Sequence, residues 1–181
     1  MHSYGTTLAS YALTRTDSRV SSFVMVGSAG IDTALVPSLA GVHADRVFTT
    51  SATADQLAPF GAELAGRAVP NPEVAHPTSP AIGGSTRFSS DGDGGALLRV
   101  DGHNPLGEAR PVPLGRVFNT VPSAGHGYFD PRTQSLKNIA AISTGNLDEV
   151  SGALSSTTAD AAKHNEDAEM IQDAQPKSPR L

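Results

Sequence analysis

The sequence contains no cysteine and no tryptophan, and aromatic residues make up only 5% of it. Without cysteine, the chain has no disulfide, no thiolate metal site and no cysteine nucleophile. It also lacks a long apolar run: the longest is Phe23-Val24-Met25-Val26, whereas a membrane-spanning helix needs roughly 20 residues. Basic clusters are missing too, and the net charge of −5 argues against nucleic acid as a partner, since grouped lysine and arginine bind its phosphates.

The residues that are present suffice for one domain of ordinary size. The chain has 181 residues, of which 38% are hydrophobic, and its 18 glycines and 13 prolines predict many turns. No secretory signal pattern is found at the N-terminus, which leaves the compartment open between cytoplasmic and secreted. Large apolar residues almost disappear from about residue 151, so we expect a folded domain over 1–150 and a disordered tail over 151–181.

Two helices and two strands are predicted from the pattern of apolar residues. Apolar side chains recur at helical spacing over residues 4–16 and again over 134–144, where Gly145 would end the helix. Short runs of apolar or β-branched residues at 23–27 and 46–50 are typical of buried parallel strands. This order of elements favours an α/β fold, with a partial, mostly parallel sheet flanked by helices.

Glycine, proline and aspartate interrupt the rest of the domain. The run Asp91-Gly92-Asp93-Gly94-Gly95 separates two short extended segments, and we expect a β-hairpin insertion over residues 86–100, because glycine permits the positive φ of a tight turn. A calcium loop is not expected there, since the glycine and glutamate that such a loop requires are replaced by Ala96 and Gly102. Residues 66–84 and 101–124 are expected to form loops.

The first five residues, Met1-His2-Ser3-Tyr4-Gly5, are similar to the G-x-S-x-G pattern of a nucleophile elbow. In this pattern a strained turn from a strand into a helix exposes a serine hydroxyl. Met1 stands at the first glycine position, and His2 is expected to have a structural role. Ser3 is therefore a candidate nucleophile, although a serine here could also serve only as the cap of the following helix.

Candidates for the acid and the base follow Ser3 in the order serine, aspartate, histidine that α/β-hydrolase elbows use. Asp55 comes shortly after the second predicted strand, at the edge where parallel sheets bind ligands. His126 has glycine on both sides, which gives it freedom to reach between serine and aspartate. Asp32 is the rival acid. His103 is the rival base, but its Asp-Gly-His-Asn-Pro setting favours a turn residue.

Four blocks of sequence, in order over about residues 2–145, carry a resemblance to a known family. They are His2-Ser3-Tyr4-Gly5-Thr6-Thr7, Phe23-Val24-Met25-Val26-Gly27-Ser28-Ala29-Gly30, Val47-Phe48 through Asp55, and His126-Gly127-Tyr128-Phe129-Asp130 with Ser135-Leu136-Lys137-Asn138-Ile139-Ala140. Together they resemble the actinobacterial α/β-hydrolases classed as a domain of unknown function (DUF1023). The resemblance implies Ser3 as nucleophile, Asp55 as acid, His126 as base and the Tyr4 amide as an oxyanion-hole donor. It implies no particular substrate.

Two departures from this family bear on activity. Family members have glycine where this chain has Met1, and their N-terminal half supplies the first strands of the sheet and a second oxyanion donor. Loss of one such donor costs roughly 3–4 kcal/mol in the transition state. We therefore expect residues 1–150 to form a partial α/β-hydrolase fold, as in a truncated gene or a gene fragment.

The predicted function is that of a serine hydrolase that cleaves small-molecule esters or amides and requires no cofactor and no metal. Two alternatives remain open. The first is a non-catalytic fragment that needs a separate N-terminal segment; it would expose apolar surface and turn over no substrate. The second is a degenerate hydrolase that acts as a binding module; it would fold stably around an incomplete or blocked site.

Overall fold

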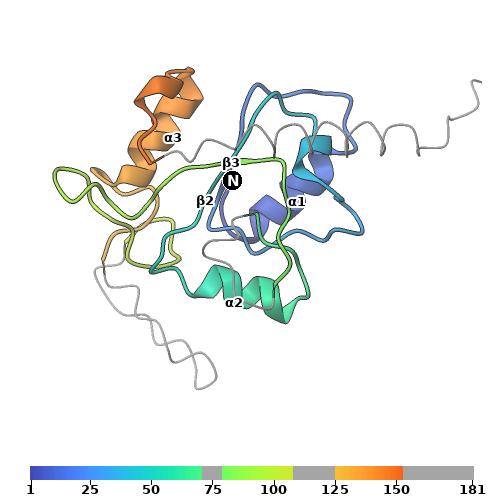
Figure 1. Ribbon diagram of the computed structural model, residues 1–181, viewed down its shortest axis with the longest axis horizontal. Helices are drawn as coiled ribbons and strands as arrows, with labels where there is room; N and C mark the ends of the chain where they lie inside the picture. Colours follow the sequence, from blue (N-terminus) through green and yellow to red (C-terminus); the bar gives the residue numbers. More distant parts are fainter. Residues whose placement is uncertain (71–78, 108–124, 153–181) are drawn as a thin grey trace, which may run out of the picture.

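A computed structural model describes residues 1–70, 79–107 and 125–152 of the chain. The elements are α1 (Tyr4–Leu13), β1 (Phe23–Val26), η1 (Leu39–Gly41), β2 (Val47–Thr50), α2 (Leu57–Leu64), β3 (Thr86–Arg87), α3 (Gln134–Thr144) and η2 (Leu147–Glu149), where η denotes a short 3-10 helix. Figure 1 shows the helices arranged around the strands. The tail predicted over 151–181 lies outside the described residues from 153 onward, as do parts of the two predicted loops, 71–78 and 108–124.

The three strands form one parallel sheet in the order β1-β2-β3. Along β1 and β2, Phe23 pairs with Val47 and Val26 with Thr50, while β3 joins the far side of β2 with Thr86 opposite Phe48. Parallel neighbours require a crossover connection, and α2 lies in the crossover from β2 to β3. The parallel sheet with flanking helices confirms the α/β class predicted from the sequence.

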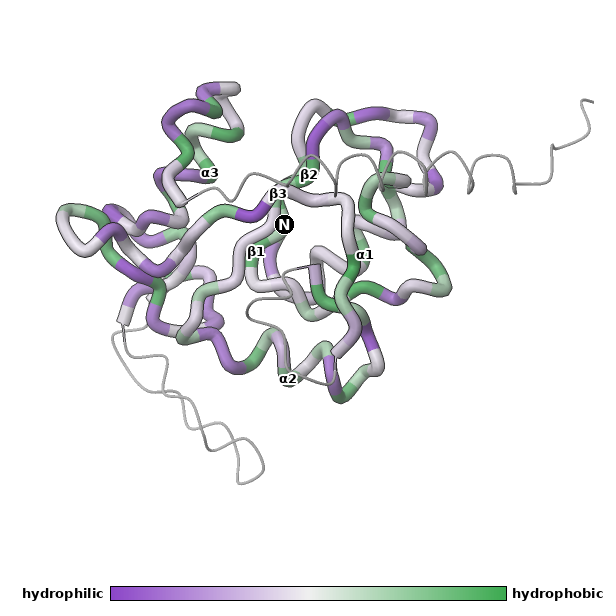
Figure 2. The backbone as a smooth tube through the Cα atoms, in the orientation of Figure 1, coloured by the Kyte–Doolittle hydropathy of each residue, from purple (hydrophilic) through white to green (hydrophobic). Residues whose placement is uncertain are grey.

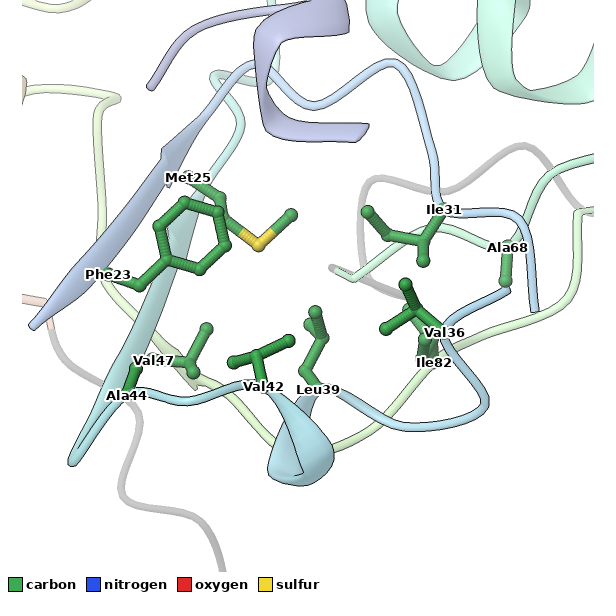
Figure 3. Packing of buried hydrophobic residues seen from close by; sticks show 10 residues of the cluster. All are labelled: Phe23, Met25, Ile31, Val36, Leu39, Val42, Ala44, Val47, Ala68 and Ile82. Atoms are coloured by element: carbon green, nitrogen blue, oxygen red, sulfur yellow. The ribbon is translucent and has the colours of Figure 1, made fainter. Parts of the chain in front are cut away.

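One face of the sheet carries the larger apolar cluster. Phe23, Met25 and Val47 point from the strands toward the segment that connects β1 with β2, and Ala9 and Leu13 of α1 pack against the same cluster. Figure 3 shows these side chains converging, and the cluster is completed by Ile31, Val36, Leu39, Val42, Ala44, Ala68 and Ile82. Burial of this face fixes the position of α1 beside β1, and thus of the turn that precedes α1.

The opposite face is covered by α3. Val24 of β1 and Phe48 of β2 pack there with Ile139 and Ile142, one and two turns into the helix. Figure 2 shows α3 with hydrophobic and hydrophilic stretches close together, as expected for a helix that buries one side. Thr133 caps the N-terminus of the helix, because its hydroxyl oxygen accepts a hydrogen bond from the Leu136 amide (3.2 Å). Gly145 (φ 80°) caps the C-terminus, as predicted.

The structure does not show the β-hairpin that was predicted over residues 86–100. Its first arm is instead the third parallel strand, because Thr86–Arg87 pairs with β2 and the Phe88 amide donates to the Thr49 carbonyl (3.0 Å). The glycine-rich run still forms a turn, in which the Asp93 carboxylate accepts hydrogen bonds from the Gly95 and Leu97 amides. The Val100 amide still donates to the Ser90 carbonyl (2.9 Å), but the second arm forms its bridge with another segment, because Leu98 pairs in parallel with Thr133.

Candidate active site

Residues 1–3 form an isolated parallel bridge to β1 and then a sharp turn into α1. His2 bridges Val26 in parallel, the Val26 amide donates to the Met1 carbonyl, and the Ser3 amide donates to the Val26 carbonyl (3.0 Å). Ser3 then has φ 55° and ψ −135°, a region that residues other than glycine seldom occupy. Such strain costs about 1–3 kcal/mol and is found where function requires an unusual geometry.

The Ser3 side chain does not cap α1. No hydrogen bond joins it to the first turn of the helix. Its Oγ instead lies 2.7 Å from Nε2 of His103. The other ring nitrogen of His103, Nδ1, lies 2.9 Å from Oδ2 and 3.1 Å from Oδ1 of Asp55. A serine, a histidine and an aspartate that are distant in sequence thus form one continuous chain of hydrogen bonds.

His103, rather than His126, occupies the position between serine and aspartate, which corrects the expectation from sequence. Nδ1 of His126 lies 3.2 Å from Oδ2 of Asp101, and the His126 side chain is 43% exposed. Asp32, the rival acid, is exposed and accepts a hydrogen bond from the Ala34 amide in a local turn. The aspartate expected from sequence, Asp55, is the one that contacts the histidine.

The segment with His126 nevertheless has a part in the site, because it holds the loop of His103 in place. The Asp101 amide donates to the His126 carbonyl (2.9 Å), and the Tyr128 amide donates to the Asn104 carbonyl (3.1 Å). These hydrogen bonds lie on either side of His103. The run from His126 to Asp130 therefore fixes the backbone from which the His103 ring projects.

Asp55 is held from several sides. Its side chain is fully buried, and it accepts hydrogen bonds from the Tyr128 hydroxyl (2.8 Å) and the Ala58 amide (3.1 Å) as well as from His103. Burial by itself would raise the pKa of this carboxyl group, but the hydrogen bonds and the nearby His103 outweigh burial and lower the pKa. Asp55 is consequently ionised at neutral pH and acts as an acceptor only.

Tyr128 holds the Asp55 carboxylate in place. Its ring is completely buried, and its oxygen accepts a hydrogen bond from the Ala52 amide (2.9 Å) while its proton goes to Asp55. Burial and the negative charge of Asp55 raise the pKa of the Tyr128 phenol well above its usual value, so the phenol keeps its proton. This residue belongs to the site, and the sequence indicated it only as part of the family-like block at 126–130.

The turn at Ser3 is braced by hydroxyl groups. The Thr6 hydroxyl donates to the Ser3 carbonyl (2.7 Å), and its oxygen lies 2.7 Å from the buried Ser28 hydroxyl. In the part of the chain that the structure describes, the Tyr4 amide has no hydrogen-bond acceptor. An amide at the first turn of a helix that is free in this way is suited to bind a developing negative charge.

Two further findings concern metal ligands and membrane-spanning helices. Over residues 1–70, 79–107 and 125–152, no group of three or more histidine, aspartate or glutamate side chains is arranged to hold a metal ion. Within the same ranges, no helix combines the length and the apolar character that crossing a bilayer requires.

Comparison with known proteins gives one family-model match over part of the chain. A family model described as "Alpha/beta hydrolase" matches residues 1–66, which include Ser3, Asp55 and the elements from α1 to α2. Searches of curated proteins and of solved structures returned no match. His103 and the segment that holds it lie beyond the matched region. The chain is thus related to the α/β-hydrolase superfamily through the part that contains the turn at Ser3 and the first two strands of its sheet.

Proposed function

We propose that this protein is a serine hydrolase that cleaves esters or amides of small molecules. The observation that carries the proposal is the contact chain Ser3–His103–Asp55, in which Ser3 lies on a strained turn between a parallel bridge to β1 and α1. The superfamily match over residues 1–66 supports it, because this region supplies two of the three residues. The four sequence blocks further favour descent from the actinobacterial DUF1023 hydrolases.

The geometry supports a division of labour among the three side chains. Since Asp55 is ionised and only accepts, Nδ1 of His103 carries the proton that is shared with it, and Nε2 is free to accept from the Ser3 hydroxyl. As Ser3 Oγ forms a bond to the substrate carbonyl carbon, its proton passes to Nε2. His103 then delivers this proton to the leaving alcohol or amine, and an acyl-serine remains.

A water molecule completes the cycle by the same route. It loses a proton to Nε2 of His103 as its oxygen attacks the acyl carbon, and Ser3 leaves with that proton. The Tyr4 amide would stabilise the oxyanion in both steps. Asp55 stabilises the imidazolium that forms at His103 and holds the ring in its orientation. The scheme requires no cofactor and no metal.

The direct test is covalent labelling with a fluorophosphonate probe, measured by intact mass. We expect one adduct on the wild-type chain and none on Ser3→Ala. His103→Ala should slow labelling by about 10⁴-fold or more, since removal of a triad member abolishes activation of the serine. His126→Ala is the matched control, because it also removes a loop histidine, and it should label within about tenfold of wild type. Equal loss in both histidine variants would contradict the assignment of the base.

A binding module is the second candidate, and exposed apolar side chains favour it. Tyr4, Leu8 and Tyr11 lie one turn apart on α1 and are 48%, 55% and 37% exposed. An exposed apolar stripe is typical of a surface that meets another molecule. A chain that is well folded by circular dichroism but takes up no probe would favour this candidate. A poorly folded, unlabelled chain would indicate a non-catalytic fragment.

A further inference from the structure

His2, the residue directly before the nucleophile, contacts the proposed base. Its Nε2 lies 2.7 Å from the backbone carbonyl oxygen of His103. The two imidazole rings are stacked at a tilt of 37°, with centroids 4.8 Å apart. Tyr128 and Phe129 border the His2 ring at 5.7 Å and 6.2 Å, so aromatic groups surround it on more than one side.

The chemistry of this contact settles which nitrogen carries the proton. A backbone carbonyl can only accept, so the short contact requires a proton on Nε2 of His2. Burial lowers the pKa of His2, and although the hydrogen bond to His103 works in the opposite direction, the net pKa is below the ordinary value. At neutral pH the residue is therefore an uncharged imidazole with its single proton directed at His103.

We propose that His2 is a positioning residue. Its side chain holds the backbone of His103 beside the parallel bridge between His2 and Val26, next to the nucleophile. This inference rests on the proposed function. The His2 backbone is paired with Val26 of β1, and Ser3 follows it directly. The hydrogen bond at the His103 carbonyl therefore links the loop of the base to the residue directly before the nucleophile, whose backbone is paired with β1. In this way two neighbouring residues, His2 and Ser3, together set the distance from Ser3 Oγ to His103 Nε2.

The uncharged state of His2 is part of the same role. His103 gains a positive charge when it takes the serine proton, and its ring lies 4.8 Å from that of His2. A second positive charge at this distance would oppose that step, since like charges repel each other strongly where water is excluded. A neutral donor holds the His103 backbone without this penalty. Positioning matters because a displacement of about 1 Å in an active site can cost on the order of 100-fold in rate.

Three substitutions separate the hydrogen bond from the ring. His2→Gln places an amide N–H at a reach similar to that of Nε2, so it should keep the tether. His2→Phe keeps the ring and removes the donor, and His2→Asn is too short to reach the His103 carbonyl. With p-nitrophenyl acetate as substrate, we expect His2→Phe and His2→Asn to lower kcat by about 10-fold to 100-fold with little change in KM. His2→Gln should remain within about threefold of wild type.

A second readout does not depend on turnover. The proton shared by His103 Nδ1 and Asp55 should give a downfield signal in proton NMR spectra of the wild type and of His2→Gln. In His2→Phe or His2→Asn that signal should broaden or disappear, because the ring is no longer held. Wild-type kcat in His2→Phe and His2→Asn, or an unchanged downfield proton in both, would overturn the inference. A wild-type chain that shows this proton but neither labelling nor turnover would instead overturn the proposed function.

Discussion

At Gly27 the backbone passes so close to the Asp55 carboxylate that a side chain would fit only if its neighbours moved. A Cβ atom placed there would lie 3.0 Å from Oδ2 of Asp55 and 3.1 Å from the Tyr128 ring. Gly27 also has φ +52°, a conformation that costs an L-residue about 1–2 kcal/mol. The residue that follows β1 is thus part of the wall of the site, although it contributes no functional group.

We predict that Gly27→Ala lowers both stability and activity. Backbone strain and displacement of Asp55 should together reduce the free energy of unfolding by about 1–3 kcal/mol. The rate of fluorophosphonate labelling should fall by about tenfold or more, since the carboxylate would shift relative to His103. Urea denaturation and timed mass spectra measure the two effects.

Gly61→Ala provides the matched control for this substitution. Gly61 lies within α2, and a Cβ atom placed there has no neighbour within 4 Å. Alanine in a helix is favoured over glycine by about 0.5–1 kcal/mol, so this variant should be slightly more stable and label normally. If Gly27→Ala behaved in the same way, the proposed crowding around Asp55 would be incorrect.

At the level of elements, β1 and α3 follow from sequence because their apolar residues point inward. Phe23 and Met25 in β1 and Ile142 in α3 are buried, and both elements were predicted within a residue of their observed ends. In α2, by contrast, Leu57, Phe60 and Leu64 are exposed. The large residues of α2 therefore do not mark the side of the helix that faces the core. For this reason the helix was not predicted from the sequence.

Two short side chains form the buried side of α2. Ala58 and Ala62 are the residues that face the interior. Alanine is common in loops and on surfaces as well as in cores, so these positions do not stand out in the sequence. The same limit applies to β3, whose two residues, Thr86 and Arg87, are half-buried and pair with β2. Neither element has a local apolar signature.

The choice between the two loop histidines could not be made from sequence for a different reason. His103 and His126 both follow a glycine in a segment without regular structure. What distinguishes them is tertiary: the 126–130 segment packs alongside the 103 loop and leaves only His103 facing Ser3. In the Asp-Gly-His-Asn-Pro run the backbone bends at Gly102 and His103, and this bend presents the ring to the site.

The start of α3 gives a prediction at the scale of one element. The Thr133 hydroxyl is fully buried and accepts the hydrogen bond from the Leu136 amide, so Thr133→Ala should destabilise the protein by about 0.5–2 kcal/mol. Thr144→Ala at the other end of the helix is the control, because its exposed hydroxyl donates only to carbonyls within the helix. Its effect on urea denaturation should stay within about 0.5 kcal/mol. Equal effects would contradict the capping role.

On the scale of the whole molecule, the site exists only when distant segments are brought together. Ser3 precedes α1, Asp55 follows β2, and His103 and Tyr128 come from two loops. Each of them contacts at least one of the others, so the interactions that align these side chains are also interactions that hold the domain together. Protonation of one of them should therefore affect the stability of the whole fold.

Acid should destabilise the protein through Asp55. Its pKa is lower in the folded state than the ordinary value of about 3.9, so the folded state binds this proton more weakly than the unfolded state does. The stabilisation is therefore complete above the ordinary pKa and is lost as the pH falls through that value toward the lower, folded one. Urea denaturation between about pH 7 and pH 2 should show a falling free energy of unfolding below about pH 4.

In Asp55→Asn, which cannot titrate, stability at neutral pH should be lower and this acid-dependent fall smaller. An equally steep fall in that variant would mean that the carboxylate is not coupled to folding, and that the hydrogen bonds from His103, Tyr128 and Ala58 do not hold it as the structure indicates.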